Sequence, residues 1–98
     1  MNEYMVIIRF TSLFTKEFIS LIPAQRTQVN QLMEKGILTS YSLSADRNTM
    51  WMTILATSEE AVEKTLRMMP LYGFMEFSVF ELMFHNSPAY TPMRFSMN

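Results

Sequence analysis

The sequence predicts an α+β protein in which a four-stranded antiparallel sheet carries two helices on one face. Strand-like and helix-like patterns follow one another in the order β-α-β-β-α-β, and the connections between them are short. The length of 98 residues suits one domain. This arrangement is the ferredoxin-like fold class. We expect the domain to occupy residues 1–85, and residues 86–98 to form an irregular C-terminal arm without periodicity.

The first strand and the first helix are predicted from their apolar patterns. Residues 4–10 (YMVIIRF) are largely apolar on both faces, which is typical of a strand that is covered on both sides. A helix is predicted over residues 15–35, with Thr15 as its cap and Gly36 after its end. Pro23 predicts either a kink or the start of the main part of this helix. One stripe of the helix carries Phe18, Ile22, Gln25, Val29 and Leu32.

The remaining elements are a hairpin, a second helix and a last strand. Three further segments have strand-like composition: 37–45, 49–56 and 74–85. The polar residues Asp46-Arg47-Asn48 form the turn between the first two of these segments. A helix is predicted over residues 58–69, and Pro70 ends it. The strand order expected for this succession is 4-1-3-2, with the first and third strands in the centre.

The composition excludes several classes of function. Hydrophobic residues make up 49% of the chain and charged residues 17%, which is too apolar for long disorder. The net charge of −1 and the thin spread of the 8 Lys and Arg argue against a nucleic-acid partner. The chain has no cysteine, 1 histidine and 2 glycines, so thiolate and multi-histidine metal sites and glycine-rich phosphate loops are excluded. We therefore expect no metal and no cofactor.

The location of the protein is predicted from two absences in the sequence. No apolar run approaches the ~20 residues of a membrane-spanning helix, so we expect no membrane partner. The beginning, MNEYMVIIRF, has no basic region ahead of an apolar stretch and leads directly into a strand pattern, so we expect no signal peptide. A cytoplasmic protein is the resulting prediction.

The sheet face turned away from the helices is predicted to be apolar. Strand alternation places on it Trp51, Leu55, Phe80 and Leu82. A face exposed to water would carry polar residues instead. We therefore expect a second copy of the same sheet to cover it, which gives a homodimer or a larger ring built from such dimers.

Two charged side chains stand out on this apolar face. Alternation along adjacent antiparallel strands places Arg9 near Glu76 and Ser78. We expect these residues to form the polar end of a ligand cavity, with Arg9 binding a carboxylate and Glu76 moving a proton. The aromatic walls of this cavity would be Tyr41, Trp51 and Phe80. The alternative is a structural ion pair between Arg9 and Glu76 at a partly solvated sheet end.

From Gln28 to Pro88 the sequence resembles the muconolactone isomerase family of dimeric α+β barrels. The strongest segment is 69–79 (MPLYGFMEFSV), which is similar to the family's Leu-Pro-Leu-Phe-Pro-Tyr-Met-Asp followed by a strand. The stretch His85-Asn86-Ser87-Pro88 is similar to the family's His-Pro-Ser ending, and the helix end Glu34-Lys35-Gly36 also fits. The resemblance implies the fold, pairing of two sheets, and a small organic acid as the ligand.

The resemblance also implies chemistry. The family's isomerisation moves a proton on a lactone acid, which needs an acid–base group and a cation for the carboxylate. His85 matches the family's terminal histidine, which makes it a candidate proton carrier beside Glu76; the alternative is an exposed histidine at a strand end. Residues 23–27 contain no carboxylate, and Thr39 and Ser40 occupy positions where family members carry Arg and His.

Two functional hypotheses follow from these observations. In the first, the protein binds a small cyclic organic acid and acts on it as an isomerase-like enzyme. In the second, it is a non-catalytic ligand-binding or assembly module that has lost the isomerase site. The charged residues of the cavity distinguish the two, because proton transfer requires an acid–base group and binding does not.

Overall fold

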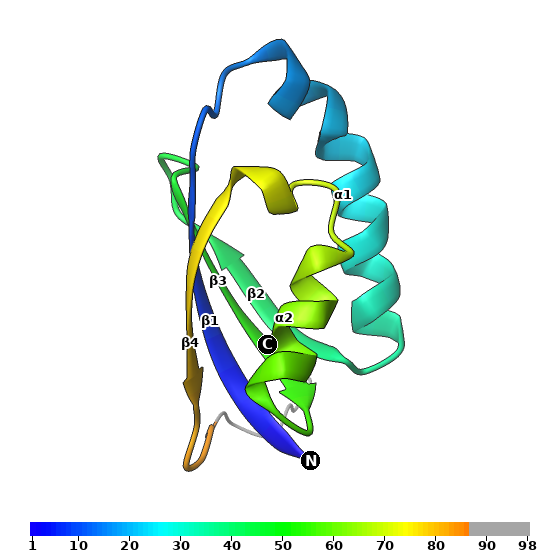
Figure 1. Ribbon diagram of the computed structural model, residues 1–98, viewed down its shortest axis with the longest axis vertical. Helices are drawn as coiled ribbons and strands as arrows, with labels where there is room; N and C mark the ends of the chain where they lie inside the picture. The colour runs from blue at the N-terminus through cyan, green and yellow to red at the C-terminus, as the bar shows by residue number, and fades with distance from the viewer. Residues whose placement is uncertain (87–98) are drawn as a thin grey trace, which may run out of the picture.

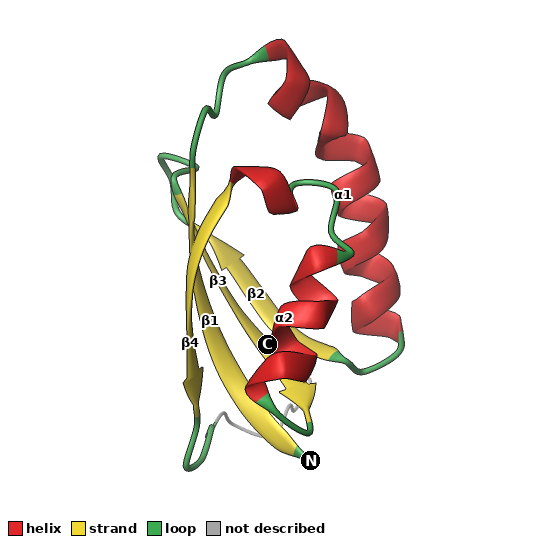
Figure 2. Cartoon of the chain, viewed as in Figure 1, coloured by secondary structure: helices red, strands yellow, loops and turns green. Residues whose placement is uncertain are grey.

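The computed structural model describes residues 1–86. In chain order its elements are β1 (Asn2–Phe10), α1 (Lys16–Glu34), β2 (Leu38–Leu43), β3 (Thr49–Ala56), α2 (Glu59–Arg67), the short 3-10 helix η1 (Tyr72–Phe74) and β4 (Met75–Glu81). The strands form one antiparallel sheet in the order β2-β3-β1-β4, and both helices cover the same face (Figure 1; Figure 2). The predicted fold class and strand order are therefore confirmed. The arm expected over residues 86–98 lies, apart from Asn86, outside the described residues.

The core lies between the two helices and one face of the sheet. The central strands β1 and β3 send alternate side chains into it, and these are buried: Tyr4, Val6, Ile8, Phe10, Met50, Met52, Ile54 and Ala56. The helices contribute the buried side chains Phe18, Val29, Leu32, Val62 and Leu66. Within residues 1–86, neither helix combines the length and the apolar character needed to cross a bilayer.

The opposite face of the sheet has no helix on it, and we call it the open face. It is formed by the other alternate side chains of β1, β3 and β4: Met5, Ile7, Arg9, Trp51, Thr53, Leu55, Glu76, Ser78 and Phe80. Alternation therefore predicted the faces of these three strands correctly.

α1 begins at the predicted cap and ends at the predicted glycine. The Thr15 hydroxyl oxygen accepts a hydrogen bond from the Phe18 N–H at 3.2 Å. The helix continues through Pro23, so Pro23 does not start its main part. Gly36 follows the helix with a left-handed φ of 74°, and its N–H donates to the Met33 carbonyl at 3.0 Å. Glycine suits this position because it has no Cβ to clash with the backbone in that conformation.

We expect Gly36→Ala to lower the free energy of unfolding by about 1 kcal/mol. A Cβ at this position meets no atom within 4 Å, so the cost comes from the left-handed backbone alone. Urea unfolding followed by circular dichroism measures the change. Gly73→Ala is the matched control: its Cβ also meets nothing within 4 Å and its φ is not left-handed, so stability should stay constant or rise slightly. Equal losses in both variants would contradict this explanation.

β4 is shorter than predicted and ends at Glu81, ahead of His85. It is an edge strand that pairs only with β1, and Glu81 lies opposite Tyr4. A last hydrogen bond runs from the Leu82 N–H to the Glu3 carbonyl at 2.9 Å. Since β1 starts just before Glu3, the residues after Leu82 have almost no strand opposite them, and their backbone groups cannot continue the ladder.

β2 contains a β-bulge that the sequence pattern did not reveal. Leu38 lies opposite Ile54. Ser40, however, lies opposite Thr53, so Thr39 is an extra residue in β2. The bulge brings the hydroxyl oxygens of Thr39 and Ser40 to 2.5 and 2.6 Å from that of Thr53. Residues after the bulge consequently face the opposite side from the one that unbroken alternation would give them.

Candidate functional site

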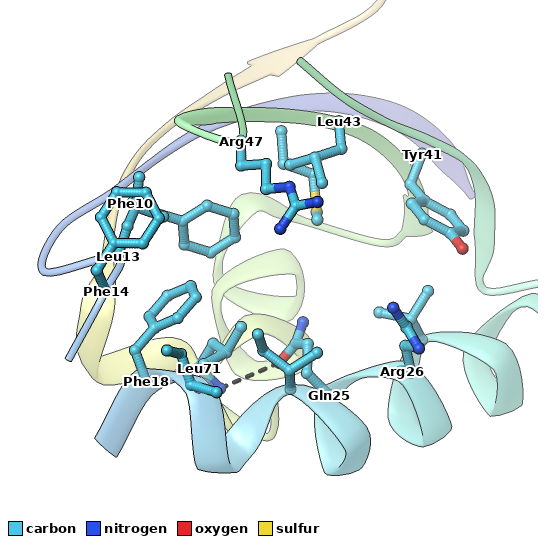
Figure 3. Close-up of a pocket in the computed structure, with 14 residues that line it drawn as sticks. Phe10, Leu13, Phe14, Phe18, Gln25, Arg26, Tyr41, Leu43, Arg47 and Leu71 are labelled. Atoms are coloured by element: carbon cyan, nitrogen blue, oxygen red, sulfur yellow. Dashed lines mark hydrogen bonds between the residues drawn. The ribbon is translucent and has the colours of Figure 1, made fainter. Parts of the chain in front are cut away.

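A cavity of about 550 Å³ lies between α1 and the helix-covered face of the sheet (Figure 3). We call it the α1 cavity. Most of its lining is apolar: Phe10, Leu13, Phe14, Phe18, Ile19, Ile22, Val29, Leu43, Met50 and Leu71. The polar lining residues are Gln25, Arg26, Tyr41 and Arg47. A mostly apolar cavity of this size with a few polar groups is the usual form of a small-molecule site.

Packed aromatic rings form one end of the α1 cavity. Phe10 and Phe18 meet edge to face, with ring centroids 5.5 Å apart. Phe18 meets Phe74 in the same way at 5.3 Å. Phe10 and Phe18 are buried, so their orientation is fixed by the core. They present a rigid apolar surface to the cavity.

The turn between β2 and β3 holds Arg47 over the cavity. The Asp46 carboxylate accepts hydrogen bonds from the Ser44 hydroxyl at 2.6 Å and from the Asn48 N–H at 2.9 Å. These two bonds lower the pKa of Asp46, because they stabilise the ionised carboxylate. Arg47 itself has a left-handed φ of 67°. Figure 3 shows its guanidinium directed from the turn into the space between the sheet and α1.

The charge of the α1 cavity is positive. Arg26, on α1, lies across the cavity from Tyr41, on β2 (Figure 3). Arg26 and Arg47 each carry a positive charge, and no described lining residue carries a negative one. The cavity therefore favours an anion. A planar guanidinium suits a carboxylate in particular, because it offers donors in a fork that matches the two oxygens.

Gln25 is the buried polar residue of the cavity, with 5% of its surface exposed. Its Oε1 accepts the Leu71 N–H at 3.0 Å. This bond fixes the orientation of the amide, because a backbone N–H requires the oxygen and not the nitrogen. The Nε2 group donates to Met69 Sδ at 3.5 Å. The two hydrogen bonds of the amide leave the second N–H of Nε2 without an acceptor among residues 1–86. Figure 3 shows the nitrogen directed into the cavity.

Most of the residues predicted for the site lie on the open face: Arg9, Trp51, Glu76, Ser78 and Phe80. Arg9 lies directly opposite Glu76, as alternation predicted. A shallow groove of about 270 Å³ is lined by these two residues with Ile7, Phe77 and Ser78. Among the described residues Arg67 and Glu63 form the single ion pair, so the structural pair between Arg9 and Glu76 that we considered as an alternative is not formed.

Two predicted site residues lie elsewhere. Tyr41 lies opposite Met52 and lines the α1 cavity, so the expectation that it shares a face with Trp51 is wrong. The cause is the bulge at Thr39, which reverses the side on which Tyr41 lies. His85 is exposed beyond the end of β4. Within one protomer, the structure therefore does not bring these two residues together with Arg9 and Glu76.

The open face exposes large apolar side chains, as predicted. The exposed fraction is 37% for Ile7, 39% for Trp51 and 51% for Phe80. Met5 and Leu55, beside them, are half-buried. Contiguous apolar surfaces of this kind are typical of interaction sites on small proteins.

Three residues of the α1 cavity, Gln25, Arg26 and Arg47, were not predicted as site residues. Gln25 could have been recognised from the sequence, because it is a polar residue on an otherwise apolar helical stripe. Arg26 follows it directly and turns towards the same cavity. Nothing in the sequence distinguishes Arg47, since charged residues are common in polar turns without any function. Only the folded turn shows that it reaches over the cavity.

Comparison with known proteins agrees with this architecture. The sequence model of the muconolactone delta-isomerase family matches residues 3–88. Among solved structures, a crystal structure of muconolactone isomerase at 3.3 Å resolution is similar with a TM-score of 0.69 and 18% sequence identity, over 91% of this chain and 96% of that chain. The curated proteins gave no match to the sequence. At this identity, the structural similarity shows the fold alone.

Proposed function

The chain belongs to the muconolactone delta-isomerase family, and on this basis we propose that it binds a small cyclic organic acid in the α1 cavity. The observation that carries the proposal is the pair Arg26 and Arg47 in a mostly apolar cavity of about 550 Å³. The family name implies a lactone acid as the ligand. A site that binds such an acid needs a cation for the carboxylate and an apolar surface for the ring. The α1 cavity offers both.

The two parts of such a ligand match two parts of the cavity. The carboxylate would be bound by Arg47 at the turn and by Arg26 on α1, where both guanidinium groups are charged at all accessible pH values. The ring would lie against Phe10 and Phe18. Each Å² of apolar surface removed from water contributes about 25 cal/mol. The arrangement therefore favours an acid with an apolar ring over a purely polar anion.

Turnover requires a group that carries a proton, and such a group has to reach the ligand. No carboxylate or imidazole among the described residues lines the α1 cavity. Glu76 and His85 were predicted as proton carriers, but Glu76 lies on the open face and His85 beyond β4. Ligand binding is thus the activity that the α1 cavity supports, and proton transfer by Glu76 or His85 stays a prediction for a ligand at the open face.

Arg47→Gly separates binding from folding. Glycine adopts the left-handed φ of 67° more readily than arginine, so the turn should be retained and thermal stability should stay constant or rise. Loss of a charged hydrogen bond costs roughly 1.5–3 kcal/mol, so we expect muconolactone and benzoate to bind at least about tenfold more weakly. Isothermal titration calorimetry measures both dissociation constants.

Two further variants sharpen this experiment. Arg67→Gln removes the same charge from α2, outside the cavity, and should bind both acids like the wild type. Arg9→Ala tests the open-face groove. A loss of binding in Arg9→Ala together with normal binding in Arg47→Gly would place the acid in that groove and contradict the proposal. A wild-type protein that binds neither acid would contradict it as well.

We also propose that a second copy of the chain covers the open face. The support is the exposure of Ile7, Trp51 and Phe80 side by side on one sheet. A two-fold contact between two such faces buries the same apolar surface on both copies and closes the groove at Arg9 and Glu76. Larger rings built from such dimers are the further prediction of this assembly.

A further inference from the structure

The buried amide of Gln25 in the α1 cavity is incompletely hydrogen-bonded. Its oxygen is held by the Leu71 N–H at 3.0 Å, and one N–H is directed to Met69 Sδ at 3.5 Å. A thioether is a weak acceptor, and the second N–H has no acceptor among residues 1–86. Leaving a buried donor unpaired is unfavourable. The free N–H therefore forms a hydrogen bond with an acceptor on the molecule that occupies the cavity.

The position of this donor restricts the ligand. Figure 3 shows the Gln25 nitrogen directed from α1 towards the space into which Arg47 points from the turn. The two residues come from opposite walls, α1 and the β2–β3 turn. In the proposed pose the carboxylate is bound by Arg47 and Arg26 and the ring lies against Phe10 and Phe18, so the ring is the part of the acid that meets Gln25. An oxygen on that part would accept the free N–H, whereas a hydrocarbon ring would leave it unpaired.

We infer that Gln25 determines specificity in the α1 cavity by donating a hydrogen bond to a ring oxygen of the ligand. The cavity thus selects cyclic acids that carry a carbonyl or similar acceptor away from the carboxylate over hydrocarbon acids of the same shape. This inference rests on the proposed function, because it assumes that an organic acid occupies the α1 cavity. It concerns selection between acids, so it makes a prediction that acid binding alone does not make.

The probes are 4-oxocyclohexanecarboxylate and cyclohexanecarboxylate, which share a carboxylate and a six-membered ring and differ in one carbonyl oxygen. The measured quantity is the ratio of their dissociation constants, obtained by isothermal titration calorimetry. For the wild type we expect the oxo acid to bind roughly three- to tenfold more tightly, the range expected for one hydrogen bond between neutral groups. A loss of folded protein affects both acids equally and leaves the ratio unchanged.

Three variants test the assignment. Gln25→Met removes the donor with little change in shape, and the preference for the oxo acid should disappear. Because this variant also leaves the Leu71 N–H without its acceptor, which lowers stability, Gln25→Glu provides a second test. Its carboxylate still accepts from Leu71 but repels the ligand oxygen, so the preference should reverse. Met69→Leu disturbs the packing around Gln25 and keeps the amide, so the preference should persist.

The outcomes distinguish this inference from the proposed function. Equal affinities of the wild type for the two acids, or an unchanged ratio in Gln25→Glu, would overturn the role of Gln25 and leave acid binding in the α1 cavity standing. A wild type that binds neither acid would overturn both. A preference that is lost in Met69→Leu but kept in Gln25→Glu would assign the selection to packing instead of to the amide.

Discussion

Trp51→Asp is expected to convert the proposed dimer into a folded monomer. Trp51 lies on β3 opposite Ile7 on one side and Ser42 on the other, near the middle of the open face. Its side chain is 39% exposed and is not part of the core, so the fold should tolerate the change. An unpaired charge buried between two sheets costs several kcal/mol, and a two-fold interface contains it twice. About 4 kcal/mol corresponds to a roughly thousandfold weaker dimer.

Sedimentation velocity at micromolar concentration measures this change, and circular dichroism reports whether the monomer is folded. Phe14→Asp is the matched control. It introduces the same charge in place of an aromatic side chain that is 80% exposed, but on the segment before α1 and away from the open face. This variant should remain dimeric. A wild-type protein that is monomeric at micromolar concentration, or a dimeric Trp51→Asp, would contradict the proposed assembly.

Ile8→Ala is expected to give the largest loss of stability, about 2–5 kcal/mol. Ile8 is fully buried in the central strand β1, between Met50 on β3 and Phe77 on β4. The loss combines the transfer free energy of the missing methyl groups with the cavity they leave, because close-packed neighbours relax only partly. The total stability of a domain of this size is about 5–15 kcal/mol, so the variant should lie close to the limit of folding.

Urea unfolding gives the free energy for Ile8→Ala. The control is Ile19→Ala, which removes the same atoms from a side chain on α1 that is 51% exposed, and we expect it to cost less than about 1 kcal/mol. If the two variants lose the same stability, the core does not lie on the helix-covered face of the sheet, and the assignment of the two faces is wrong.

The fold followed from the sequence because its signals are local and agree with one another. Side chains of β1, β3 and β4 alternate without interruption, so their faces were predictable, including the position of Arg9 opposite Glu76. The end of β4 was not predictable from its own residues, since Leu82, Met83 and Phe84 continue the apolar composition of the strand. β4 ends where β1 has no further residue to pair with it. The position of this end therefore depends on how the two strands are paired.

The candidate site was harder to predict from the sequence than the fold. Its position depends on the bulge at Thr39, and a bulge leaves no periodic signal in a strand as short as β2. Tyr41 was therefore assigned to the wrong face. Arg47 reaches the cavity only through the conformation of its turn. Such features arise from tertiary geometry, whereas sequence periodicity reports only which side of an element is buried.

The bulge at Thr39 links two surfaces of the molecule that otherwise vary independently. Deletion of Thr39 would remove the bulge and leave Tyr41 and Leu43 in the α1 cavity, because the residues after it would keep their partners on β3. Flattening of the bulge with Thr39 retained would instead shift the pairing by one residue, so that Tyr41 and Leu43 leave the α1 cavity for the open face and Ser42 turns towards α1. A one-residue shift in the pairing of β2 would thus change the lining of the cavity and the composition of the open face together.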